Sequence, residues 1–75
     1  MKLPARIEAK SDVMMGKPCV KGTRIPVYLL LQKMGAGETS EQLLSAYPQL
    51  KADDLNACIQ YGAALAGEEI VLTEA

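Results

Sequence analysis

The sequence predicts an α+β fold, in which a short N-terminal β-ribbon is followed by three helices arranged as a helix-turn-helix unit. Two observations lead to this prediction. Residues 16–27 contain two prolines and two glycines, which steer the backbone through turns and extended pieces and interrupt helices. From residue 26 onward, apolar side chains recur with the spacing of amphipathic helices, in three runs separated by turn residues.

The ribbon is predicted over residues 5–25. Residues 5–9, Ala-Arg-Ile-Glu-Ala, alternate apolar and charged side chains, as a half-buried strand does. Residues 13–15 are expected to extend a second strand into a turn at Gly16, and Cys19-Val20 is expected to return from that turn. A ribbon this small is only marginally stable alone, so we expect a helix or a second copy of the chain to cover it.

The first helix is predicted at residues 26–35. Pro26 suits its first position, where a missing N–H loses no helical partner, and Gly35 suits the position just after its end. Apolar side chains cover more than one face of this helix, which indicates burial on two sides. In so small a domain the second side is expected to meet another copy, giving a homodimer. The predicted dimer contacts are Ile7, Tyr28 and Leu29.

Two further helices are predicted at residues 40–47 and 52–66. Thr39 and Gln42 have the spacing of a capping box, in which each side chain bonds the other's backbone N–H. Pro48 cannot continue a helix and therefore ends the second one. Residues 1–67 are thus predicted to form a single domain, with residues 68–75 as a C-terminal tail.

Composition argues against catalysis and against metal or cofactor binding. The chain has 75 residues, no histidine, and no serine or cysteine beside a plausible base. Its two cysteines, Cys19 and Cys58, are too few for a disulfide framework and too far apart for a zinc knuckle. We expect both to be buried free thiols in a reducing cytoplasm. Neither a signal peptide nor a membrane-spanning segment is indicated.

Charge is divided between the two halves of the chain. Residues 1–33 carry seven basic and two acidic side chains, a net charge of +5, whereas residues 34–75 carry one basic and seven acidic, a net charge of −6. The division suggests a polyanion partner for the first half or a basic partner for the second, although solvation of opposite faces also explains it. Within the acidic tail stands an apolar triplet that we expect to bind a partner protein. It consists of Ile70, Val71 and Leu72.

Nucleic-acid binding is predicted from two regions, the constrained basic run and the outer face of the third helix. The candidate residues are Lys17, Lys21, Thr23, Arg24, Asn56 and Gln60. The two amides are of the types that pair with adenine in the major groove. Against this, Asp53 and Asp54 begin the third helix, where DNA-binding proteins normally supply cations. An ordinary solvated face is therefore the alternative for the helix, and an ion pair with Glu8 is the alternative role of Arg24.

Several motifs resemble a small prokaryotic family described as domain of unknown function four-three-three. The chain reads Gly-Lys-Pro-Cys-Val-Lys-Gly-Thr-Arg-Ile-Pro-Val at residues 16–27 and Tyr-Pro-Gln-Leu at residues 47–50. Family members commonly read Gly-Lys-Pro-hydrophobic-x-Gly-Thr-Arg-Ile-Pro-Val and later Tyr-Pro-x-Leu. The likeness covers about residues 6–66. The chain departs from the family at Ser11-Asp12 and Met15, which suggests a rebuilt first turn, and at Lys51, which weakens the cap of the third helix.

The resemblance implies a VapB-type antitoxin with a homeodomain-like helix-turn-helix. Its implied partner is a toxin of the PIN-like nuclease class. We therefore expect an antitoxin-like protein that binds and neutralises such a nuclease, with DNA binding for autoregulation as a second role. The alternative is a DNA-binding transcriptional regulator without a toxin partner.

Overall fold

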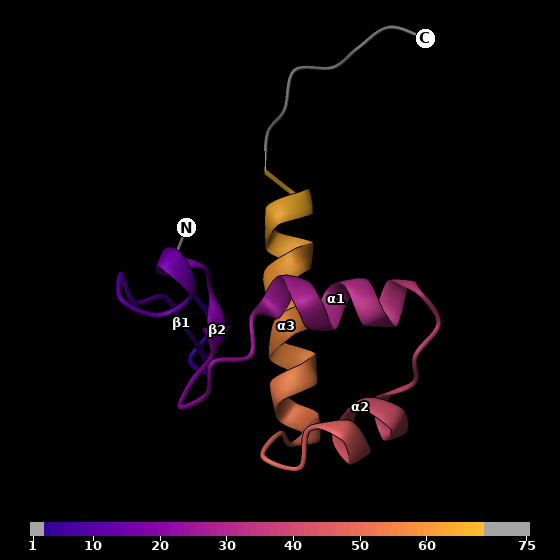
Figure 1. The fold of residues 1–75 in the computed structure, drawn as a ribbon. Coiled ribbons are helices and arrows are strands. Elements are labelled where there is room, and N and C mark those ends of the chain that lie inside the picture. The colour runs from indigo at the N-terminus through magenta and orange to yellow at the C-terminus, as the bar shows by residue number, and fades with distance from the viewer. Residues whose placement is uncertain (1–2, 69–75) are drawn as a thin grey trace, which may run out of the picture.

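The computed structural model describes residues 3–68 and has the predicted α+β architecture (Figure 1). A two-stranded antiparallel sheet comes first and three helices follow it. The elements are β1 (Ile7–Glu8), a 3-10 turn (Met14–Gly16), β2 (Cys19–Val20), α1 (Val27–Gly35), α2 (Ser40–Ala46) and α3 (Ala52–Ala66).

The ribbon consists of two short strands that contribute apolar side chains to the core. Ile7 lies opposite Val20 and Glu8 opposite Cys19. The apolar members of these pairs are buried against the helices, with Ile7 4% and Val20 1% exposed. The helices thus cover the ribbon, as its small size requires.

The strand predicted at residues 13–15 is wrong, because this segment forms a 3-10 turn. Met14 and Met15 have φ angles of 49° and 57°, in the left-handed region that a strand does not use. The turn closes when the N–H groups of Gly16 and Lys17 donate to the carbonyls of Val13 and Met14, at 3.0 and 3.1 Å. The side chain of Met15 is 92% exposed, so no apolar contact draws it into the sheet.

Helix α1 begins one residue later than predicted. Pro26 has extended angles, φ −70° and ψ 142°, and forms the N-cap. It stays extended because it bridges to Cys19 of β2, while the N–H of Val27 donates to the Pro18 carbonyl at 2.9 Å. The ribbon's pairing therefore continues up to the residue at which the helix starts.

The end of α1 also differs from the prediction. Gly35 is the last helical residue, and the chain reverses two residues later at Gly37, whose φ is 99°. The N–H groups of Gly37 and Glu38 donate to the carbonyls of Met34 and Lys33, at 3.1 and 3.0 Å. This pattern is a Schellman motif, which satisfies carbonyls that the helix leaves unpaired.

The predicted capping box of α2 is confirmed. Gln42 N–H donates to Thr39 Oγ1 at 3.2 Å, and Thr39 N–H donates to Gln42 Oε1 at 2.8 Å. Helix α3 has the predicted bounds although Lys51, at its N-cap, offers no side-chain acceptor. Instead the Lys51 N–H donates to Oδ2 of Asp54 at 2.8 Å, which supplies half of a capping box.

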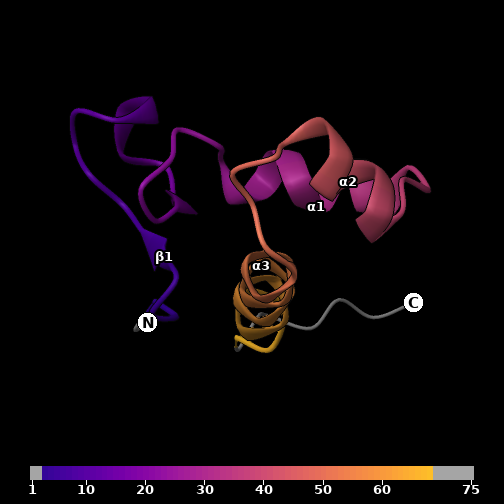
Figure 2. The same ribbon diagram turned by 90° about the horizontal axis from the view of Figure 1, so that it is seen from below.

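The helices cross to enclose one core. Figure 1 shows α1 crossing α3 near its middle, with α2 beside the start of α3 and the ribbon beyond the start of α1. Figure 2, which looks nearly along α3, shows that α1 and α2 lie on one side of it. The centre of the core is formed by Leu30, Leu43, Leu55 and Cys58, each at most 2% exposed.

The second half of α3 extends beyond the other helices (Figure 1). Ile59 comes four residues after the buried Leu55, a spacing that predicts the same buried face, but it is 50% exposed. Leu65, further along the helix, is 43% exposed. Ala57, which is expected with Asn56 and Gln60 on the outer face of the helix, is only 5% exposed because the N-terminal segment lies beside it. Within residues 3–68 no helix is both long and apolar enough to cross a membrane.

Candidate functional site

The structure distributes the predicted nucleic-acid-binding residues over three places. Lys21, Thr23 and Arg24 lie in the turn that follows β2. Asn56 and Gln60 lie on α3, on the side that faces the N-terminal segment. Lys17 lies apart from both groups, beside the start of α1.

Thr23 has a structural part in the turn after β2. Its Oγ1 donates to the Val20 carbonyl at 2.7 Å and accepts from the N–H of Ile25 at 3.0 Å. Gly22, with a φ of 79°, donates its N–H to Oε1 of Glu8 at 3.2 Å. These bonds fix the backbone of the turn, and with it the positions from which the basic side chains on either side of Thr23 extend.

The alternative role of Arg24 does not appear in the structure. Glu8 contacts the Gly22 N–H and, at 3.7 Å, the ammonium of Lys10. Within residues 3–68, Arg24 takes part in no ion pair, and both Arg24 and Lys21 are exposed. Two cations at this turn are therefore open to solvent.

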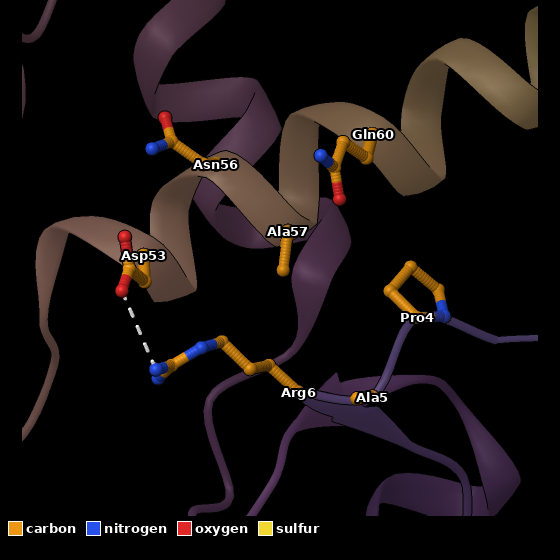
Figure 3. A pocket seen from close by; sticks show the side chains of 7 residues that line it. All are labelled: Pro4, Ala5, Arg6, Asp53, Asn56, Ala57 and Gln60. Carbon is orange, nitrogen blue, oxygen red and sulfur yellow. Dashed lines mark hydrogen bonds and ion pairs between the residues drawn. The ribbon is translucent and has the colours of Figure 1, made fainter.

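A polar hollow of about 330 Å³ lies between the N-terminal segment and the first half of α3 (Figure 3). We call it the Arg6 hollow; its lining residues are Pro4, Ala5, Arg6, Asp53, Asn56, Ala57 and Gln60. Figure 3 shows the Arg6 guanidinium reaching Asp53, whereas the Asn56 amide points away from it. Gln60 and Asn56 are exposed, as the periodicity of the sequence predicts.

Arg6 contacts the carboxylate of Asp54 more closely than that of Asp53. Its Nη1 donates to Oδ1 of Asp54 at 3.0 Å, and Nη2 lies 3.5 Å from Oδ2 of Asp53. The Asp54 side chain is only 11% exposed, whereas the Asp53 side chain is 72% exposed. Arg6 therefore offsets part of the negative charge at the start of α3, and the three side chains together keep a net charge of −1.

Sequence reasoning did not assign Arg6 to the site. Its place in an alternating segment marked it only as the outward residue of a strand. The contact joins residues 48 positions apart, and local spacing carries no information about such a pairing. The available signal was the pair of acids at the start of α3, next to a lysine that cannot cap it.

An apolar groove of about 230 Å³ lies between the start of α1 and the second half of α3. We call it the α1–α3 groove; its lining residues are Lys17, Pro18, Val27, Tyr28, Leu31, Tyr61 and Leu65. The ammonium of Lys17 lies 5.0 Å from the centre of the Tyr28 ring, a cation–π distance. The predicted phosphate contact at Lys17 is thus at the rim of an apolar surface and not beside the other cations.

The three predicted dimer residues have different surroundings. Ile7 is 4% exposed and packs inside its own chain, whereas Tyr28 is 45% exposed. Leu29 is partly buried on α1. The predicted partner-binding residues, Ile70, Val71 and Leu72, lie outside the described part of the chain.

Both cysteines are free and buried, as expected. Burial raises the pKa of each thiol, that of Cys58 to about 11, and the nearby Asp54 carboxylate contributes to the shift at Cys58. A thiol with a raised pKa is a poor nucleophile, so the two groups are packing elements. Across residues 3–68, His, Cys, Asp and Glu side chains form no group of three or more that could hold a metal ion.

Comparison with known proteins agrees with the motif. Residues 7–62 match the family described as "Protein of unknown function (DUF433)", and the chain belongs to this family. It is 34% identical over 58 residues to "Uncharacterized protein y4eO" of Sinorhizobium fredii, a match that covers 77% of this chain and 26% of that protein. The fold resembles the crystal structure of a DUF433 member from Anabaena variabilis, with a TM-score of 0.76 and 34% identity.

The chain is shorter than both relatives. The structural match covers 79% of this chain and 58% of the crystallised one, and the curated relative is about four times as long as the matched segment. The shared part is therefore a module, and activities of the longer proteins do not transfer to it directly.

Proposed function

We propose that this protein is antitoxin-like and binds and neutralises a nuclease of the PIN-like class. The observation that carries the proposal is the free second half of α3, where Ile59 and Leu65 are 50% and 43% exposed. Exposed apolar side chains on a protruding helix are a common means of binding another protein. The Gly16–Val27 motif resembles a family described as VapB-type antitoxins, and this supports the choice of partner.

The charge of the second half of the chain supports a basic partner. Between residues 34 and 68 the chain carries several acidic side chains and one basic one, Lys51. A nuclease has to attract phosphate, so the approach to its active site is expected to be basic. An acidic protein with an exposed apolar helix suits such a surface in both respects.

The test is to co-purify the protein with the product of each adjacent reading frame and to assay RNA cleavage by the captured protein. We expect a stable complex in which cleavage is suppressed. Ile59→Glu should weaken the complex at least tenfold, because a charge replaces an apolar contact. Ser45→Glu adds the same charge at an exposed position of α2 and serves as the matched control. If no neighbour product is a nuclease that binds, the proposal fails.

DNA binding is the second candidate, favoured by the neighbourhood of the Arg6 hollow. The N–H of Lys21 donates to the Arg6 carbonyl at 2.8 Å, so the basic turn adjoins the hollow that Asn56 and Gln60 line. The cations of the turn suit contacts with phosphates. The exposed amides lie on α3, which with α2 would form a helix-turn-helix unit, and they suit contacts with bases. Autoregulation by operator binding would use this surface, as would a regulator without a toxin partner.

Titration against the protein's own upstream DNA at several salt concentrations tests this role. A dimer that engages Lys21 and Arg24 twice should give a slope of log affinity against log salt of about −3.6. Arg24→Ala should weaken binding to all sequences alike, whereas Gln60→Ala should change the preference among sequences. Lys33→Ala, which breaks only a 3.5 Å pair with Glu38, is the control. Absence of binding at low salt, with and without the partner, would remove DNA from the function.

A further inference from the structure

The α1–α3 groove continues the buried face of α3 past the point where the rest of the fold covers it. Tyr61 and Leu65 follow the fully buried Cys58 at three and seven residues, the spacing of one helix face. At Gly62 a Cβ atom would lie 3.2 Å from Cδ1 of Leu31, so the two helices are in close contact along one side of the groove. The opposite side is open, which leaves an apolar floor without a cover among residues 3–68.

We propose that the groove binds the C-terminal segment of the same chain, residues 69–75, with Ile70, Val71 and Leu72 on the apolar floor. The place where the described chain ends favours this occupant. Helix α3 ends at Ala66, directly after Leu65 on the groove's rim, and the described chain ends at Glu68. Seven extended residues span about 23 Å, whereas the helix rises only about 6 Å from Tyr61 to Leu65. The segment is long enough to fold back over the groove.

The chemistry of the segment matches that of the groove. Its apolar triplet is preceded by Glu69 and followed by Glu74, so an apolar centre has a carboxylate on each side. The groove has the complementary arrangement, an apolar floor with the Lys17 ammonium at its rim. Within residues 3–68, Lys17 has no carboxylate partner, and its ammonium is held 5.0 Å from the Tyr28 ring. A glutamate of the segment would therefore meet an available cation.

Docking would control access to the same apolar triplet that a partner protein would bind. A partner then has to displace the segment. The partner's apparent affinity equals its intrinsic affinity multiplied by the fraction of molecules in which the segment is free. This consequence rests on the proposed function, whereas the docking itself does not depend on any partner.

The experiment compares amide NMR spectra of the isotopically labelled full chain and of a chain truncated after Glu68. We expect shift differences at Tyr28, Leu31 and Tyr61, as well as at Leu65, with spectra otherwise superimposable except at the residues next to the new C-terminus. The differences should be independent of protein concentration, because the contact is within one chain. The double variant Ile70→Ser, Leu72→Ser keeps the segment's length and should reproduce the spectrum of the truncated chain at these four residues.

Matched variants on the body of the protein separate the groove from the rest of α3. Leu65→Ser should reduce the shift differences, whereas Ile59→Ser, on the same helix and similarly exposed but outside the groove, should leave them unchanged. Lys17→Gln should make docking weaker and less dependent on salt. Identical spectra for the full and truncated chains would overturn the proposal. Differences that grow with concentration would also overturn it, since a second copy would then be the occupant.

Discussion

Asp54 joins two parts of the fold that lie far apart in the sequence. It accepts the N–H of Lys51 at 2.8 Å, which caps α3, and the guanidinium of Arg6 at 3.0 Å, which ties the N-terminal segment to the same helix. Its neighbour Asp53 meets Arg6 only at 3.5 Å and is largely exposed. The two adjacent aspartates are therefore expected to contribute differently to the stability of the fold.

Replacing these two acids separately should measure the difference. Asp54→Ala removes the cap and leaves Arg6 with only its weaker partner, so we expect a loss of about 1–3 kcal/mol in the free energy of unfolding. Asp53→Ala should change it by less than about 0.5 kcal/mol, because an exposed pair contributes little. Urea unfolding followed by circular dichroism measures both values. Equal effects would show that Asp54 has no special role.

Cys58 should make the protein less stable in alkali. Its folded pKa is raised to about 11 from an ordinary value of 9.0. Below pH 9 the thiol is protonated in both states and stability is unaffected. Between pH 9 and pH 11 the unfolded thiol ionises while the folded one does not, so the free energy of unfolding falls, by on the order of 2 kcal/mol in total.

The check is a series of denaturant titrations from pH 8 to pH 11 on the wild-type chain and on Cys58→Ala. The variant should be less stable throughout, because of a small cavity, but should lose less stability as the pH rises. Parallel curves for the two proteins would show that the decline comes from other groups.

At the scale of elements, two glycines at the end of α1 have different backbone conformations. Gly35 is helical, and a Cβ atom added there would meet nothing within 4 Å, whereas Gly37 has a φ of 99°. Gly35→Ala should therefore stabilise the protein by about 0.5–1 kcal/mol, since alanine is the better helix former. Gly37→Ala should destabilise it by about 1 kcal/mol, because a Cβ is disfavoured at that φ. Thermal unfolding of the two variants should show shifts of opposite sign.

Elements whose ends are set by local bonds could be predicted from the sequence. The capping box at Thr39 and Gln42 acts within four residues, and the bounds of α3 followed from its period. The left-handed turn at Met14 and Met15 could not be predicted, because methionine seldom adopts positive φ and is not a residue type that signals a turn. A strand was the natural expectation for that apolar run.

The candidate site was predictable to a similar extent. Periodicity correctly gave the exposure of Asn56 and Gln60, since the helix alone determines it. It failed at Ile59, because the buried face of α3 is centred on Asp54, Ala57 and Cys58, and which face is covered depends on how the other elements pack against the helix. It could not give the contact between Arg6 and Asp54, which arises only when the folded ribbon meets α3.

At the scale of the whole molecule, exposed apolar residues gather around α1 and the free half of α3. Tyr28, Ile59 and Leu65 are 45%, 50% and 43% exposed, whereas the core beneath them is fully buried. Association with a second copy remains our prediction for the isolated protein.

Sedimentation analysis at tens of micromolar protein should detect a homodimer. Leu29→Glu should shift the equilibrium towards monomer by at least tenfold, because it places a charge in the predicted contact outside the α1–α3 groove. Ser45→Glu, which adds the same charge on exposed α2, should leave the equilibrium unchanged. A wild-type chain that stays monomeric up to several hundred micromolar would contradict the prediction.

The two buried thiols also provide a way to follow how the molecule comes apart. Cys19 lies in the ribbon and Cys58 lies at the centre of α3, and each is at most 2% exposed. A thiol reagent can reach either sulfur only after the structure around it opens, so each labelling rate reports a different opening event. Equal rates would mean that ribbon and helices separate in one cooperative step. Faster labelling of Cys19 would mean that the ribbon detaches first, leaving the three helices as the last part to unfold.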